Sequence, residues 1–247
     1  MESYEYKALS ELMSWKDEMR KKPQLFENTA KDIQNSINRL LPQKYHEIVT
    51  SAIKNLTRTV LFGSKYLTKP PLERLSLMER ERLVREKIGI YKTAAAAEGA
   101  ATGAGGFLWG LADFPLLLGI KIKYLYDAAS IYGFDVSNYK ERLYILNIFQ
   151  LAFSSKDHAN KVFEKMDKWD EYSRFLPADI NQFDWESFQR EYRDYIDLAK
   201  LLQLVPGIGA FVGLYANNKL MHKLGETSIQ AYRMRLLTPS GKGASGR

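Results

Sequence analysis

Two carboxylates are possible acid–base groups, because they lie inside otherwise apolar sequence. Glu98 and Asp113 flank the run GAATGAGGFLWGLA. A carboxyl group buried among apolar residues has a raised pKa and can transfer protons near neutral pH. One hypothesis is therefore an enzyme that uses Glu98 and Asp113. The sequence favours the alternative, in which Asp113 caps a helix beginning near Pro115 and a hydrogen bond or salt bridge holds Glu98.

The other patterns that carry chemistry are incomplete. The run GSK at 63–65 lacks the first glycine of a phosphate-binding loop, because Arg58 occupies that position. The glycines at 103, 105 and 106 lack the last glycine of a dinucleotide-binding fingerprint, which is Leu108 here. The histidines are scattered, and the absence of cysteine rules out disulfides, thiolate metal ligands and a cysteine nucleophile. We therefore predict no catalytic residues, no bound metal and no cofactor.

Charge is distributed unevenly along the chain. The net charge is +7, yet the stretch from Asp157 to Asp197 holds eleven acids and six bases. The excess of lysine and arginine falls elsewhere, for example from Lys219 onward, and basic faces of this kind favour anionic surfaces such as lipid head groups. The alternative is an ordinary solvated face. Nucleic acid is not favoured as a partner, because the aromatic-rich stretch from Trp169 to Tyr195 is the acidic one.

The sequence predicts helices almost throughout. Proline is sparse and no sustained two-residue alternation indicates a strand. Ser76 and Glu79 fit a capping box, and Gly133 fits a C-terminal stop. Asn138 and Asp184 fit N-terminal caps. The expected helices are 3–21, 26–40, 43–66, 75–100, 114–132, 139–153, 157–173, 185–204 and 208–236.

These elements predict an all-α protein, a multi-helix bundle with two glycine-rich apolar helical hairpins packed together. The break at Pro70 and Pro71 divides a polar N-terminal helical region, 1–70, from a helical core, 71–237, and a flexible tail follows at 238–247. One continuous domain is the alternative. The opening run MESYEYKALSELMSWKDEMRKK mixes both charges and shows no secretory signal. We therefore expect the protein in the cytosol or at the inner face of the cell membrane.

Two apolar segments, 94–120 and 201–218, are the centre of this prediction, and we name them glycine segments 1 and 2. Each contains glycines four residues apart, a spacing that places both on one helix face where another backbone can approach closely. These pairs are Gly99 with Gly103, Gly106 with Gly110, and Gly209 with Gly213.

Neither glycine segment reads as an ordinary transmembrane helix. Segment 2 is barely long enough to span a bilayer, and Pro206 interrupts it. Segment 1 contains Glu98 and Asp113, and an acidic residue costs about 2.5–3.5 kcal/mol at the bilayer centre. Three interpretations stay open: a buried core with close helix packing, a pair of re-entrant hairpins in one leaflet, and an apolar pocket for a lipid or acyl chain.

Three blocks of the sequence resemble the EcsC family. They are EGAATGAGGFLWGLADFPLLLGI, the run IYGFD at 131–135 and VPGIGAFVGLYANNKLMHKLGETSIQAYRMRLL. The candidate binding or structural positions are Glu98 and the positions that match the recurrent family motif. The motif positions are Gly99, Gly103, Gly106, Asp113, Pro115, Gly133, Pro206, Gly209, Gly213, Asn217 and Arg235.

The resemblance implies a bacterial protein encoded beside a two-part ABC transporter that is linked to protein secretion, and it assigns no catalytic residue. We therefore expect a non-enzymatic accessory protein, peripheral on the cytoplasmic membrane face. Its expected partners are an anionic membrane surface or a transporter subunit. The alternatives are a soluble lipid- or acyl-binding protein with an apolar cavity under the two glycine segments, and an enzyme that uses Glu98 and Asp113.

Overall fold

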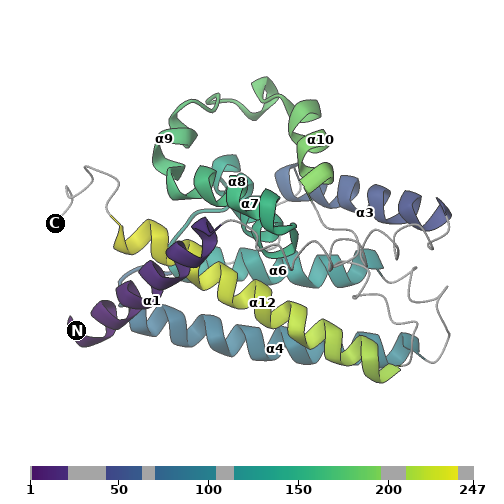
Figure 1. The fold of residues 1–247 in the computed structure, drawn as a ribbon, viewed down its shortest axis with the longest axis horizontal. Helices are drawn as coiled ribbons and strands as arrows, with labels where there is room; N and C mark the ends of the chain where they lie inside the picture. The colour runs from purple at the N-terminus through teal and green to yellow at the C-terminus, as the bar shows by residue number, and fades with distance from the viewer. Residues whose placement is uncertain (1, 22–42, 63–69, 104–113, 196–209, 239–247) are drawn as a thin grey trace.

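The computed structural model of the chain describes residues 2–21, 43–62, 70–103, 114–195 and 210–238 (Figure 1). These residues form helices and contain no β-strand, which confirms the all-α prediction. The helix expected at 26–40 lies outside them. In chain order the elements are α1 (Glu2–Arg20), α3 (Gln43–Phe62), α4 (Leu77–Gly103), α6 (Phe114–Tyr132), α7 (Tyr139–Phe153), α8 (Lys156–Asp167), α9 (Trp169–Arg174), the 3-10 turn η2 (Ile180–Gln182), α10 (Trp185–Tyr195) and α12 (Ala210–Leu237).

The long helices α4 and α12 pack along each other in opposite directions (Figure 1). Early in α4, Glu81 pairs with Arg233 of α12. Further along α4, Ile88 packs against Gly225. The partner on α12 moves toward that helix's beginning as α4 proceeds, so the two helices are antiparallel.

Helix α6 also packs antiparallel to α4. Arg80, near the start of α4, donates a hydrogen bond to the carbonyl of Ile131, near the end of α6. Tyr91, at the middle of α4, packs edge-on against Tyr124 with 5.8 Å between ring centroids. The end of α4 therefore lies at the same end of the bundle as the beginnings of both α6 and α12.

Local sequence signals set the ends of these helices as predicted. The Ser76 amide donates to the Glu79 carboxylate at 2.8 Å, and the Glu79 amide donates to the Ser76 hydroxyl at 3.4 Å. These are the two bonds of a capping box. Gly133 follows α6 with φ of 91°, and the amide of Phe134 donates to the carbonyl of Ala129 as in a Schellman motif.

Two further predicted caps are present, and one predicted helix is divided. Asn138 accepts a hydrogen bond from the amide two residues on, and Asp184 accepts one from the amide three residues on. The helix expected at 157–173 is interrupted at Lys168, whose backbone leaves the helical region and separates α8 from α9. Neither glycine nor proline marks that break in the sequence.

Helix α7 is the centre of the hydrophobic core. The run LYILNIFQLAF is buried along its whole length, as expected for an apolar helix with no solvent face. Helices α3, α6, α8 and α12 pack around it. The hydroxyl of Tyr144 donates to the carbonyl of Ala231 at 2.7 Å, which ties α7 to α12.

The N-terminal helix α1 is held onto α8 and α12 by ion pairs and onto α4 by a hydrogen bond from Tyr4 to Glu81. Lys16 lies 2.5 Å from Asp167, and both side chains are largely buried. On the far side of the bundle, α9, η2 and α10 form an arch that returns to α3 (Figure 1). Trp185, Phe188 and Tyr192 share one face of α10, as their spacing predicts, and their rings contact one another in sequence order.

Candidate functional site

The candidate positions of the two glycine segments fall partly within the described residues. Glu98, Gly99 and Gly103 lie in the last turns of α4. Pro115 lies in the first turn of α6, and the first two turns of α12 hold Gly213 and Asn217. The remaining segment positions, which are Gly106, Asp113, Pro206 and Gly209, lie outside the described residues.

The flanking helices bring the two segments to one end of the bundle. Glycine segment 1 leaves α4 at Gly103 and enters α6 at Phe114, close to the predicted boundaries. Glycine segment 2 enters α12 at Ala210. Because α6 and α12 both run antiparallel to α4, these three helix ends lie at the same end of the bundle, and we name this region the glycine end (Figure 1).

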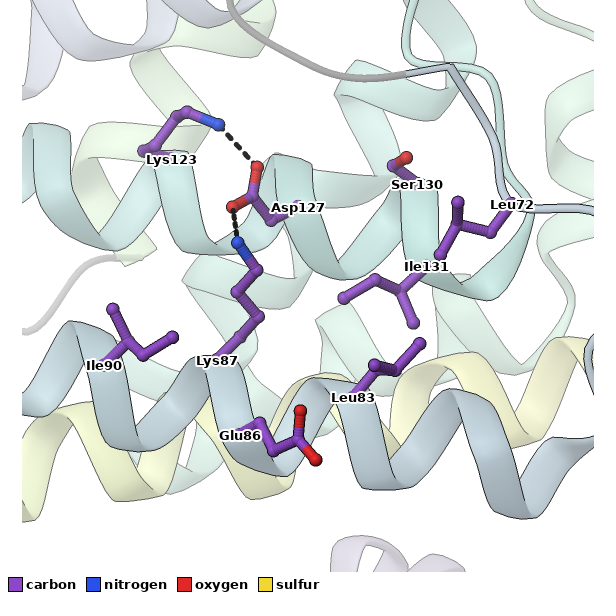
Figure 2. A pocket seen from close by; sticks show the side chains of 9 residues that line it. All are labelled: Leu72, Leu83, Glu86, Lys87, Ile90, Lys123, Asp127, Ser130 and Ile131. Atoms are coloured by element: carbon purple, nitrogen blue, oxygen red, sulfur yellow. Dashed lines mark hydrogen bonds and ion pairs between the residues drawn. The ribbon is translucent and has the colours of Figure 1, made fainter.

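A groove of about 420 Å³ lies between α4 and α6, some turns away from the glycine end (Figure 2). Its volume falls in the range of roughly 300–1,000 Å³ that small-molecule sites occupy. The groove lining combines aliphatic side chains with a group of charged ones. The lining residues are Leu72, Leu83, Glu86, Lys87, Ile90, Lys123, Asp127, Ser130 and Ile131.

The charged group in this groove has one carboxylate between two ammonium groups (Figure 2). Lys87 of α4 lies 3.1 Å from one oxygen of Asp127, and Lys123 of α6 donates to the other oxygen. The hydroxyl of Tyr91 also donates to Asp127, at 2.9 Å. The carboxylate is mostly buried, whereas both lysine side chains are more than a third exposed. The group therefore carries an excess of one positive charge.

The environment of Asp127 changes its acidity. Burial by itself raises the pKa of this carboxyl, but hydrogen bonds from the two lysines and Tyr91 outweigh burial and hold the pKa below its usual range. A carboxylate with a depressed folded-state pKa stabilises the fold above its unfolded-state pKa of about 3.9. That contribution disappears as the pH falls through the folded-state value.

We expect Asp127→Asn to flatten the acid limb of the stability profile. The wild type should lose stability between about pH 5 and pH 2 partly because Asp127 becomes protonated, and the variant has no such proton to bind. Urea unfolding at several pH values across this window measures the difference. Asp17→Asn, at a 70% exposed side chain on α1, is the matched control and should follow the wild type. An acid limb of equal slope in Asp127→Asn and wild type would contradict the assignment.

Arg235, the candidate position nearest the end of the family blocks, has a structural role. Its guanidinium pairs with both oxygens of Glu141 on α7. The same group lies 3.8 Å from the ring centroid of Phe134 and 4.8 Å from that of Tyr144. Cation–π contact and a bidentate ion pair together fasten the end of α12 to α7.

Gly133, in the IYGFD run, has a backbone conformation that favours glycine, and a side chain there would crowd Arg80. Its φ of 91° lies in the left-handed region that favours glycine. A Cβ at this position would lie 3.1 Å from the Arg80 guanidinium. That guanidinium donates to the carbonyls of Leu72, Leu75 and Ile131, so it joins the end of α6 to the segment before α4. This motif glycine therefore supports a helix-terminal junction.

Several polar groups inside the bundle carry no strong signal in the sequence. Glu81 and Arg233 pair across α4 and α12 from positions 152 residues apart. Lys121 is fully buried in α6, and burial lowers its pKa to about 7. The spacing of Lys123 and Asp127, four residues apart on a helix, is the one local signal that points toward the groove. Their approach to Lys87 depends on how α4 and α6 pack.

The described residues set limits on other kinds of site. No group of three His, Asp or Glu side chains among them is placed to hold a metal ion. None of the described helices combines the length and apolar character that crossing a membrane requires. A second cavity of about 410 Å³ lies between the starts of α1 and α4 and is lined by Ser3, Tyr4, Glu5, Lys7, Ser76 and Met78.

Comparison with known proteins gives the relationship of the chain. Residues 6–237 match the EcsC protein family. Protein EcsC of Bacillus subtilis (strain 168) is 43% identical over 230 residues, which cover 93% of this chain and 94% of that protein. The chain belongs to the EcsC family. Uncharacterized protein YdbA of the same organism is 26% identical over 250 residues, covering 93% of this chain and 92% of YdbA. No solved structure matches the chain.

The EcsC match extends well beyond the three blocks that carry the resemblance. It begins in α1, at residue 6, and so includes the helices that precede the Pro70–Pro71 break. Within the described EcsC residues, the motif positions Gly133 and Arg235 occupy junctions between helices. The end of α4 and the beginnings of α6 and α12 lie at the glycine end.

Proposed function

We propose that this EcsC protein is a non-enzymatic accessory protein that binds peripherally to the cytoplasmic face of the membrane. There it would act beside an ABC transporter of a protein secretion system, which is the association that the family resemblance implies. The observation that carries the proposal is the glycine end. Two apolar segments that lie far apart in the sequence leave and enter the bundle at the same end.

Side chains near the glycine end suit an anionic, partly apolar surface. Leu116, in the first turn of α6, is 48% exposed. Lys219 and Lys223 are exposed on one face of the first half of α12, four residues apart. Exposed apolar groups can enter the interfacial region of a bilayer, while each lysine close to anionic lipid contributes about 1 kcal/mol. The apolar contact would act at the glycine end, and the two lysines would act along α12, about 2.5 and 3.6 turns from Ala210.

Vesicle flotation tests the proposal. The full-length protein should float with vesicles that contain phosphatidylglycerol and should float less with phosphatidylcholine alone, because the attraction is largely electrostatic. Replacing both lysines, in Lys219→Gln/Lys223→Gln, removes about 2 kcal/mol and should weaken binding about 30-fold. Raising the salt concentration should reduce the difference between variant and wild type.

The matched control removes two positive charges elsewhere. Arg82 on α4 and Lys168 between α8 and α9 are exposed and lie away from the glycine end. Arg82→Gln/Lys168→Gln should therefore bind vesicles nearly as the wild type does. Equal losses in the two double variants would show attraction by net charge alone. A wild type that stays unbound with anionic vesicles would overturn the proposal and favour a lipid carrier or enzyme.

A further inference from the structure

We propose that the groove between α4 and α6 binds a single-chain amphiphile with one anionic head group. The head group would contact the ammonium groups of Lys87 and Lys123, and the alkyl chain would lie against Leu72, Leu83 and Ile131. This site is separate from the glycine end, and its occupation does not require a membrane. The inference therefore stands independently of the proposed function.

The apolar part of the groove lies to one side of the charged group (Figure 2). Leu83 of α4 and Ile131 of α6 face each other there, and Leu72 covers them from the segment before α4. Leu72 and Leu83 are only half-buried, so apolar surface remains accessible in the groove. An alkyl chain that covers this surface gains roughly 25 cal/mol per Å² removed from water.

The chain segment over this part of the groove is fixed in place. The amide of Leu72 donates to the carbonyl of Ser130 at 2.9 Å, and the Ser130 hydroxyl donates to the carbonyl of Pro70 at 2.8 Å. These bonds attach the segment to the last turns of α6 and define one boundary of the groove. The volume of the groove suits a small molecule better than a partner helix, which is about 10–12 Å in diameter.

The charged part of the groove selects an anion. A lysine ammonium has three donors, and among the described residues Lys87 and Lys123 each direct one to the single carboxylate of Asp127. That carboxylate also accepts a hydrogen bond from Tyr91, so it already has three hydrogen-bond donors around it. The lysines retain donors and one unit of uncompensated positive charge. A carboxylate or phosphate monoester placed beside the two lysines would accept hydrogen bonds from them and neutralise the excess positive charge.

Other charges and apolar groups around the groove fit this orientation. Glu86 lies on the α4 side of the groove, but it pairs at 2.6 Å with Arg82, which reduces its repulsion of an anion. Ile90 lies beyond Lys87, away from Leu83, and is 60% exposed. An apolar side chain so exposed next to an ammonium group suits contact with the amphiphile close to its head group.

Titration calorimetry with decanoate, kept below its micelle concentration, tests the inference. The wild-type full chain should bind decanoate saturably at one site. Decanol has the same chain without the charge and should bind at least about tenfold more weakly, which corresponds to about 1.4 kcal/mol. Decyltrimethylammonium should not compete. Equal affinity for all three compounds, or no saturable binding of decanoate, would overturn the proposal.

Two variants with opposite expected effects separate ligand binding from a structural role. Lys87→Met/Lys123→Met should weaken decanoate binding about tenfold or more, because both ammonium groups are lost. Asp127→Asn should instead tighten it several-fold, because the competing carboxylate is removed while both lysines remain. If the three charged residues only stabilised the fold, decanoate binding would not tighten in Asp127→Asn and would weaken in both variants. Lys54→Met, at an exposed lysine on α3, is the control and should leave affinity unchanged.

Photocross-linking locates the ligand without any substitution. A diazirine analogue of decanoate should label peptides from residues 70–91 and 123–132, and excess decanoate should suppress the labelling. Labelling confined to 94–120 and 201–218 would place the ligand at the glycine segments and overturn the groove assignment. Competition by phosphatidylglycerol vesicles shows whether a membrane lipid can supply the same chemistry; suppression by monomeric decanoate alone assigns the groove to a free amphiphile.

Discussion

Replacing Glu81 by glutamine is expected to lower the free energy of unfolding by about 3–5 kcal/mol. Glu81 is completely buried in α4, and its two oxygens each lie 2.7 Å from a nitrogen of Arg233, which is 2% exposed. The hydroxyl of Tyr4 donates to the same carboxylate at 2.8 Å, so the group joins α1, α4 and α12. Glutamine leaves the arginine charge buried with only the half-exposed carboxylate of Glu11 beside it.

Urea unfolding at neutral pH measures this loss, and a second pair on the same helix provides the comparison. Arg82 and Glu86 form an ion pair of similar length, but their side chains are 65% and 53% exposed. Arg82→Met should change the free energy of unfolding by less than about 1 kcal/mol, because water screens an exposed pair. Replacing both members of the buried pair with methionine should recover much of the stability. A loss in Glu81→Gln no larger than that in Arg82→Met would refute the buried-pair account.

The second large effect is expected at Gly225, where α12 crosses α4. A Cβ at this position would lie 2.5 Å from Cδ1 and 2.8 Å from Cγ1 of Ile88. Alanine therefore overpacks a buried contact between the two helices, and we expect it to destabilise the protein by about 1–3 kcal/mol. Ile88→Val removes the nearer carbon. The double variant should be more stable than the sum of the single effects predicts, which a double-mutant cycle measures.

Gly89, the neighbour of Ile88 on α4, supplies a control of opposite sign. It is exposed inside a long helix, and a Cβ there would meet nothing within 4 Å. Gly89→Ala should therefore stabilise the protein by about 0.5–1 kcal/mol, because alanine has the higher helix propensity. Thermal unfolding of both variants gives the comparison. Destabilisation by Gly89→Ala would contradict the role of helix propensity at that position. Stabilisation by Gly225→Ala would contradict the close packing against Ile88.

Helix ends could be predicted from the sequence where the residues that cap them lie within a few positions of one another. The capping box at Ser76 and Glu79 closes across three residues, and the stop at Gly133 bonds Phe134 to Ala129 within one turn. Such interactions form wherever those residue types stand at that spacing. The burial of α7 could also be predicted, because a helix that is apolar all round has no face for water. The interruption at Lys168 could not, since no local breaker marks it.

Pairs that join distant helices depend on which faces pack together. Glu81 looks like one of several acids in the charged first half of α4, and only α12 beside it makes that position a buried ion pair. Gly225 stands outside both glycine segments, and its need for a small side chain comes from Ile88 alone. The groove likewise exists because Lys87 and Asp127 face each other across two helices. Side-chain chemistry alone does not specify such partners.

The glycine segments show the division between sequence and tertiary structure. Their composition, their spacing and the family resemblance were determined by the sequence by itself, because glycine content and apolar length are properties of the chain. The position of the adjoining helix ends at one end of the bundle was decided by the tertiary structure. It follows from α6 and α12 both packing antiparallel on α4, an arrangement that buries the apolar faces of three helices at once and that no single segment encodes (Figure 1).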